Sequence, residues 1–192
     1  MKVSATVRLP PVPAESYSVE QKAAAEDFFA TRKVGFSGPW NVFIRSPELL
    51  THAQRMGEYL RYRCTVAGRL SELTILIVAR HWTQDYEWGT HRNHAVKAGV
   101  SEETVEAIRI GRRPPNLNED EASVYEFVSE LLHNRCVSDP TYANALARFG
   151  EQGVIDLCGI VGYYQLLALT MNVARVDPPK GETPMPRFPF ER

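Results

Sequence analysis

Two carboxylates and one histidine lie in an otherwise apolar stretch near the middle of the 192-residue chain. Glu87 and His91 are four residues apart, so a single helix places both side chains on one face, within reach of each other. Glu72 begins the preceding predicted helix. Ionisable groups within core-forming sequence usually have shifted pKa values, which general acid–base chemistry needs. We therefore predict Glu72, Glu87 and His91 as catalytic residues.

The Glu87–His91 pair has two interpretations. A carboxylate beside an imidazole raises the pKa of the imidazole and orients its ring, which gives an acid or base near neutral pH. Such a pair is also common on solvated helix surfaces, where it stabilises the helix by about 0.2–0.5 kcal/mol. Glu72, in a first helical turn, equally compensates the helix dipole.

Five further residues are candidates for substrate binding. Aromatic side chains around the predicted acid and base would exclude water and strengthen electrostatic interactions inside a pocket. An arginine can hold a carboxylate through two parallel hydrogen bonds, and an asparagine offers a polar contact. The predicted substrate-binding residues are Arg80, Trp82, Tyr86, Trp88 and Asn41.

Metal binding is an alternative on the same helix. His91 and His94 are three residues apart and share a face with Glu87, but the chain has no H-E-x-x-H motif. We expect no metal and no cofactor, and if a metal binds, His91 and His94 are the candidate ligands.

Cysteine usage, composition and charge narrow the function further. Cys64, Cys136 and Cys158 form no C-x-x-C pair and are expected to be buried thiols. A formal net charge of −1 gives no electrostatic reason to expect nucleic acid or an anionic membrane as a partner. No apolar run approaches the roughly 20 residues of a spanning helix, and the N-terminus lacks the apolar segment of a secretory signal. We expect a cytoplasmic protein that acts on a small molecule.

The elements that position these residues are predicted as helices separated by marked stops. Ser18 with Gln21, and Asn118 with Glu121, have the spacing of capping boxes. The β-branched run at 74–79 would also suit a strand, but a helix is favoured because its neighbours are helical and no partner strand is available. The expected helices span about 18–33, 47–65, 72–82 (capped by Ser71), 86–98 (capped by Asp85), 101–111, 118–134, 139–150 and 153–174.

The predicted domain is a single all-α unit over residues 18–176, flanked by proline-rich arms at 1–17 and 177–192. Proline cannot continue a helix or occupy a central strand, so the arms are irregular. The C-terminal arm is expected either to be disordered or to lie over a neighbouring subunit through Met185, Phe188 and Phe190.

The chain resembles the carboxymuconolactone decarboxylase family, which includes the alkyl hydroperoxidase D-like proteins. The likeness covers about residues 36–175. The motifs that carry it are E-L-x-I-L-x-V-A-R (Glu72 to Arg80), Y-E-W-x-x-H (Tyr86 to His91) and G-Y-Y (Gly162 to Tyr164). The resemblance implies an alkyl hydroperoxidase D-like helical bundle that assembles into trimers or hexamers.

The resemblance also separates two branches of the family. In the redox branch, a C-x-x-C-x-x-x-H motif and an upstream glutamate carry thiol peroxidase chemistry. Here the positions of the two thiols are Gln84 and Glu87, whereas Glu72 and His91 match the glutamate and the histidine. Peroxidase turnover needs a low-pKa thiolate and a resolving thiol, so the missing cysteines disfavour it.

Three functional hypotheses follow. The first is a cofactor-independent lyase or isomerase that acts by proton transfer on a small carboxylated lactone or unsaturated acid, with His91 supported by Glu87 as proton donor and Glu72 as a second relay. The second is a peroxidase or reductase that uses an unrecognised cysteine, with Cys64 as the candidate because its neighbours Arg61 and Arg63 would lower the pKa of its thiol. The third is a non-catalytic binding protein, in which the two glutamates and the histidine bond each other and no cavity of a few hundred Å³ reaches them.

Overall fold

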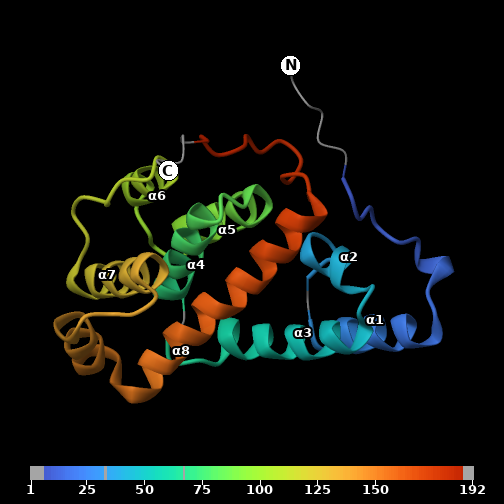
Figure 1. The fold of residues 1–192 in the computed structure, drawn as a ribbon, viewed down its shortest axis with the longest axis horizontal. Coiled ribbons are helices and arrows are strands. Elements are labelled where there is room, and N and C mark those ends of the chain that lie inside the picture. The colour runs from blue at the N-terminus through green and yellow to red at the C-terminus, as the bar shows by residue number, and fades with distance from the viewer. Residues whose placement is uncertain (1–6, 33, 67, 188–192) are drawn as a thin grey trace.

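The computed structural model describes residues 7–32, 34–66 and 68–187, and this part of the chain folds into helices without any strand (Figure 1). The prediction of an all-α fold is confirmed. The helices are α1 (Val19–Thr31), α2 (Pro39–Phe43), α3 (Pro47–Tyr62), α4 (Arg69–His81), α5 (Asp85–Lys97), α6 (Glu102–Arg109), α7 (Glu119–Asn134) and α8 (Asp139–Ala174), with a 3-10 turn, η1, at Ala14–Ser16.

Helix α8 crosses the molecule diagonally and packs against α2, α3, α4 and α7 (Figure 1). Helix α4 packs against α5, α7 and α8, so it is covered on several sides. Ile75 and Leu76 of α4, and Leu157 and Ile160 of α8, are completely buried. Burial of each such side chain contributes about 1.5–3 kcal/mol. This enclosure explains why the 74–79 part of α4 can be apolar on nearly every side.

Length and composition alone would allow α8 to cross a membrane. However, 56% of its most apolar window is buried among the described residues, as is typical of the core helix of a folded domain. Gly150 also interrupts its helical geometry, with φ of 68°. The break confirms the predicted stop between residues 139–150 and 153–174.

Three predicted helix starts are confirmed, and two predicted caps are wrong. Ser18 and Asn118 both form complete capping boxes, and the Ser101 side chain accepts from the Thr104 N–H. Ser71 does not cap α4, because that helix begins earlier, after Gly68, and Ser71 is buried inside it. Asp85 does not cap α5, because the Gln84 side chain accepts the N–H groups of Tyr86 and Glu87 instead.

One short helix was missed by sequence reasoning. No helix was predicted between residues 33 and 47, but α2 begins at Pro39, directly after Gly38. Gly38 has φ of 58°, and a Cβ atom there would lie 2.2 Å from the Tyr86 ring. Glycine therefore allows both the turn before α2 and the close approach of α5.

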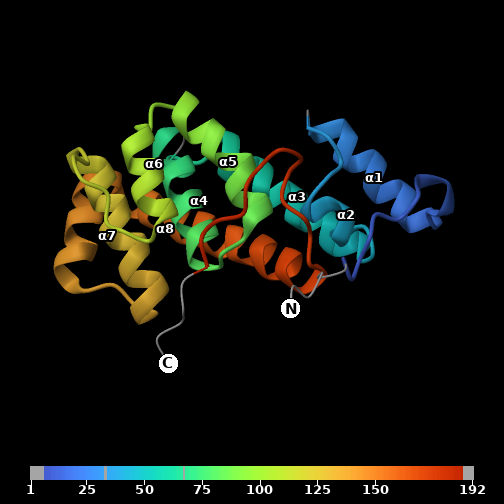
Figure 2. The same ribbon diagram turned by 90° about the horizontal axis from the view of Figure 1, so that it is seen from above.

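The described part of the C-terminal arm folds back over α5 of its own chain (Figure 2). Met185 is buried, and its backbone N–H donates to the Asp85 carboxylate at 2.8 Å. The Arg187 guanidinium pairs with the same carboxylate. Residues 177–187 are therefore ordered against the helical domain, whereas Phe188 and Phe190 lie outside the described residues.

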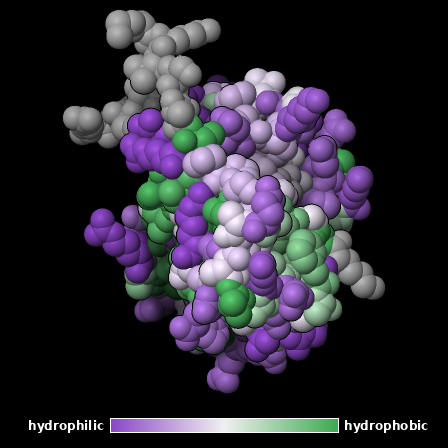
Figure 3. Space-filling view, turned by 90° about the vertical axis from the view of Figure 1, so that its right-hand side faces the viewer, coloured by the Kyte–Doolittle hydropathy of each residue, from purple (hydrophilic) through white to green (hydrophobic). Residues whose placement is uncertain are grey.

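The surface mixes apolar and charged side chains. On the side formed by the N-terminal helices, hydrophobic patches lie between hydrophilic ones (Figure 3). Phe29 on α1 and Met56 on α3 are among the exposed apolar residues. The expectation of three buried thiols is correct for Cys64 and wrong for Cys136 and Cys158, which are exposed.

Candidate active site

The contact of α4 with α5 brings Glu72 and His91 together. His91 Nδ1 lies 2.7 Å from Glu72 Oε2, and the two side chains are only 7% and 11% exposed. A second cation, Arg61 on α3, places its guanidinium nitrogen 3.7 Å from Glu72 Oε1. Three helices therefore converge on one buried carboxylate.

The environment of Glu72 favours its ionised form. Burial alone would raise the pKa of its carboxyl group, but the hydrogen bond from His91 and the positive charge of Arg61 outweigh burial and lower the pKa. Because Glu72 holds Nδ1 of the imidazole, Nε2 is the ring nitrogen left for proton exchange.

Glu87 has the opposite environment. It is 2% exposed, and neither carboxylate oxygen bonds to any described residue. Burial without a compensating charge raises its pKa well above the usual value, so the neutral, protonated form of this carboxyl group is favoured. The expected Glu87–His91 hydrogen bond is therefore wrong: Glu72, fifteen positions before Glu87, holds the ring instead.

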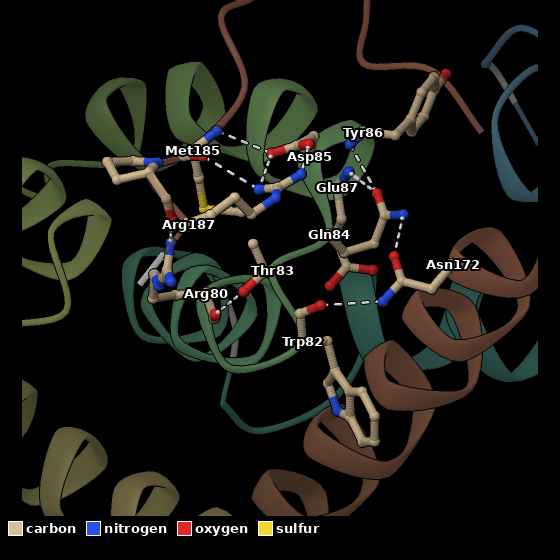
Figure 4. Close-up of polar contacts among 11 residues, drawn as sticks. Arg80, Trp82, Thr83, Gln84, Asp85, Tyr86, Glu87, Asn172, Met185 and Arg187 are labelled. Carbon is tan, nitrogen blue, oxygen red and sulfur yellow. Dashed lines mark hydrogen bonds and ion pairs between the residues drawn. The ribbon is translucent and has the colours of Figure 1, made fainter. Parts of the chain in front are cut away.

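Helix periodicity explains why Glu87 faces inward. Asp85 and Glu87 are two residues apart on α5 and point to opposite sides (Figure 4). Asp85 points to the C-terminal arm, where it accepts from Met185 and Arg187. Glu87 points between α4 and α8, and none of the dashed lines in Figure 4 reaches its carboxylate.

Glu87 and His91 line one small cavity of about 70 Å³, which we call the Glu87 pocket. Ligand pockets are typically about 300–1,000 Å³, so this one admits a small reactant or the reacting end of a larger one. Helices α2, α3, α5 and α8 and the end of α1 supply its walls. Its other lining residues are Arg32, Pro39, Trp40, Arg61, Tyr86, Thr90, Tyr163, Tyr164, Leu167 and Met171.

Arg32 brings a buried cation to the wall of this pocket. It is 6% exposed, its Nη2 donates to the Gln54 carbonyl oxygen at 2.7 Å, and its guanidinium stacks over Trp40. Its Nε has no hydrogen-bond partner among the described residues. A buried donor without a partner is costly, and it marks a place for an acceptor on a bound molecule.

Two tyrosines on α8 complete the wall beside His91. The Tyr164 ring meets the His91 ring edge to face, with centroids 5.2 Å apart. Burial raises the pKa of Tyr163 to about 12 and also raises that of Tyr164. Both phenols are therefore neutral at physiological pH and offer O–H groups rather than negative charge.

Only one predicted substrate-binding residue lines the Glu87 pocket, and that residue is Tyr86. Trp88 is buried in the core, and Arg80 and Trp82 line a separate cavity. Asn41 is half-buried on α2 and does not line the pocket.

Sequence reasoning missed most of the walls. Tyr163 and Tyr164 belong to the G-Y-Y motif, and Thr90 follows Tyr86 by one helical turn, so these three carried a signal. Arg32 carried none, because its position depends on how α1 packs against α3.

Thiol chemistry at Cys64 and metal binding at His91 and His94 have less support in this geometry. The Cys64 thiol donates to the carbonyl oxygens of Leu60 and Val66, and burial raises its pKa. Its flanking cations lie elsewhere, with Arg61 beside Glu72 and Arg63 paired with Glu58. Among the described residues no three His, Cys, Asp or Glu side chains gather as a metal site, and the rings of His91 and His94 lie 5.9 Å apart.

Compared with known proteins, the chain matches no family model and shows no significant match to a curated protein. The resemblance to the carboxymuconolactone decarboxylase family therefore stays a prediction that depends on the motifs alone.

Proposed function

We propose that the protein is a cofactor-independent acid–base enzyme, a lyase or isomerase, that acts on a small carboxylated lactone or unsaturated acid. The observation that carries this proposal is the buried, unpartnered Glu87 carboxyl group in the same cavity as His91, whose ring is held by Glu72 from outside the lining. Environments that push the pKa values of two carboxyl groups apart are typical of sites that pair an acid with a base.

Each group has a distinct role in the proposed reaction. Glu87, protonated at neutral pH, donates a proton to the reacting molecule. His91 accepts a proton through Nε2, and Glu72 is a positioning residue that holds Nδ1 and stabilises the imidazolium. This differs from the sequence prediction, in which His91 was the donor and Glu87 its support.

The substrate class follows from the cations and the size of the pocket. The unpartnered Nε of Arg32 suits a carboxylate or lactone oxygen, and the guanidinium fixes its direction. In a decarboxylation, the electrons of the breaking carbon–carboxylate bond flow into the unsaturated system, and Glu87 supplies the proton to the remote carbon. In an isomerisation, His91 removes one proton and Glu87 delivers another. Neither reaction needs a cofactor.

The rival hypotheses have less support. A structural network would have all three groups bonded to each other, but Glu87 bonds to neither Glu72 nor His91, and a cavity reaches it. That cavity, at about 70 Å³, is smaller than the few hundred Å³ that would count against the non-catalytic hypothesis. A peroxidase would need a reactive Cys64, whose thiol has a raised pKa instead.

The decisive experiment screens the purified full-length protein against lactone and muconate-type acids for carbon dioxide release and for isomerised product. On an active substrate, Glu87→Gln should lower kcat by about a hundredfold or more, because it removes the proton without changing the shape of the side chain. The exposed Glu151→Gln on α8 is the matched control. Near-normal turnover by Glu87→Gln would refute the mechanism.

The proposal also includes the alkyl hydroperoxidase D-like bundle, a trimer or hexamer, and a cytoplasmic location, which stand as predictions from the resemblance and composition. Exposed apolar residues on α8, including Ile155, Leu169 and Val173, are available for self-association. Sedimentation velocity of the purified protein would give its subunit number directly. A monomer at micromolar concentration would contradict the predicted assembly.

A further inference from the structure

A second, much larger cavity lies away from the Glu87 pocket. It measures about 750 Å³ and is lined by the end of α4, by α6, α7 and α8, and by the C-terminal arm. We call it the His81 basin, after the residue at the end of α4 that forms part of its wall. The two cavities share no lining residue. Its volume is within the range of cavities that hold whole small molecules.

The basin combines an apolar floor with aromatic walls. Ile77 of α4 and Ile108 of α6 are buried, and Leu132 of α7 is half-buried. Trp82 and Tyr125 add partly buried rings that pack at the edge of the core. An apolar molecule placed on this floor would remove its remaining surface from water, which favours binding.

The charge of the basin is one-sided. Arg80, Arg112 and Arg187 line it, and no described lining residue is Asp or Glu. Asp85 neutralises Arg187 from outside the lining, and Arg80 donates to the Pro186 carbonyl oxygen. Arg112 is exposed and forms no side-chain hydrogen bond or ion pair with the described part of the chain. It is the cation available to a ligand.

Two further observations agree with an excess of positive charge. The pKa of Arg80 is lowered, first by burial and then by the positive charge of Arg187. His81 and His133 meet edge to face, 5.5 Å apart, and burial, followed by the charge of His133, lowers the pKa of His81. His133 Nδ1 donates to the Ser129 carbonyl oxygen at 2.8 Å, which fixes its ring. A bound anion would offset this mutual repulsion.

We propose that the His81 basin binds an amphipathic organic acid, with its flat apolar body on the isoleucine and leucine floor and its anionic group at Arg112. The apolar floor supplies affinity, and the guanidinium sets the orientation and rejects uncharged analogues. The proposal does not depend on the reaction in the Glu87 pocket. The basin is an additional binding site on the same chain.

The test uses an amphipathic anionic dye, 8-anilinonaphthalene-1-sulfonate, whose fluorescence rises in apolar surroundings. Titration of the full chain at about 0.15 M salt, where long-range charge effects are screened, should show saturable binding of one dye per chain. Arg112→Glu should weaken binding at least about tenfold, because it replaces an attractive charge by a repulsive one. Leu132→Ser should weaken dye binding severalfold, because it replaces an apolar side chain of the floor by a polar one.

Two controls distinguish binding at this site from nonspecific binding of the dye. Lys22→Glu on α1 makes the same change in net charge at an exposed position outside the basin and should leave the affinity unchanged. The uncharged analogue N-phenyl-1-naphthylamine should bind at least about tenfold more weakly than the sulfonate. Circular dichroism and light scattering check that each variant keeps its helices and its mass.

Three outcomes would overturn the proposal. Equal dye affinity in the wild type and Arg112→Glu would show that the Arg112 guanidinium does not contribute to binding. Equal affinity for the charged and uncharged dyes would make the basin a plain apolar surface. Absence of saturable binding, together with a change of molecular mass in Arg112→Glu, would show that a second copy of the chain covers the basin.

Discussion

The Glu87 pocket and the His81 basin differ in size by an order of magnitude, at about 70 and 750 Å³, yet it is the smaller cavity that holds a buried carboxyl group, whereas the described lining of the larger one has none. Glu87 is buried without a partner, whereas the basin exposes Arg112 to water. Water screens an exposed charge, whereas a buried charge without a partner has nothing to compensate it. Cavity volume therefore indicates where a molecule fits, and burial of an ionisable group indicates where chemistry is prepared.

If this comparison holds, removing a group from the Glu87 pocket should have the largest effect on stability. His91→Ala takes away the hydrogen-bond donor of the buried Glu72 carboxylate and leaves Arg61, at 3.7 Å, as the remaining cation. Breaking a buried pair costs about 3 kcal/mol in free energy of unfolding. Urea unfolding followed by circular dichroism measures this difference.

The neighbouring His94→Ala is the matched control, because His94 is exposed on the next turn of α5. It should change the free energy of unfolding by less than about 0.5 kcal/mol. Equal effects of the two substitutions would mean that the Glu72–His91 hydrogen bond adds nothing measurable to the free energy of unfolding.

The second prediction concerns the pH dependence of stability. Above pH 4.5 the unfolded Glu87 carboxyl loses its proton, whereas the folded one keeps it until its raised pKa. The folded state then binds more protons, so this contribution to stability is complete below pH 4.5 and is lost as the pH rises through the folded pKa. Glu87→Gln should remove that loss, which amounts to about 1.4 kcal/mol per pH unit.

Unfolding free energies of wild type and Glu87→Gln, measured from pH 5 upward, should therefore diverge. Glu72→Gln provides the contrast. The pKa of Glu72 is lowered, so its contribution is present above the usual pKa of 4.5 and is lost as the pH falls through the folded pKa. Parallel curves for wild type and Glu87→Gln would show that Glu87 is not buried as a neutral acid.

Sequence reasoning identified the helices and the chemical groups but not their partners. The spacing of Glu87 and His91 was read correctly as one helix face, yet helix periodicity gives no distance between residues on different helices. Glu72 reaches His91 because α4 and α5 pack side by side. Arg32 enters the pocket because α1 ends there, and that depends on tertiary packing. Capping boxes at Ser18 and Asn118 were predictable because all their partners lie within three residues.

The third prediction tests how tightly the wall of the Glu87 pocket is packed. A Cβ atom on Gly57 of α3 would lie 2.0 Å from the Tyr163 hydroxyl and 2.5 Å from Arg32 Nη2. Overpacking of this kind costs about 1–3 kcal/mol. Gly57→Ala should therefore lower the melting temperature, even though alanine is the better helix former.

Gly162→Ala on α8 is the matched control, because no atom lies within 4 Å of the added Cβ. It should stabilise the protein by up to about 1 kcal/mol through helix propensity alone. A pocket wall that could relax freely would let both alanine variants gain stability together.

The smallest effect is expected in the His81 basin. Arg112 is exposed and bonds to no described side chain, so Arg112→Ala should change the free energy of unfolding by less than about 0.5 kcal/mol. The same substitution should still weaken the binding of an anionic dye, because the guanidinium serves a ligand rather than the fold. A destabilisation close to that of His91→Ala would instead show that Arg112 stabilises the fold. The contrast between a buried reactive pocket and an open binding basin would then be wrong.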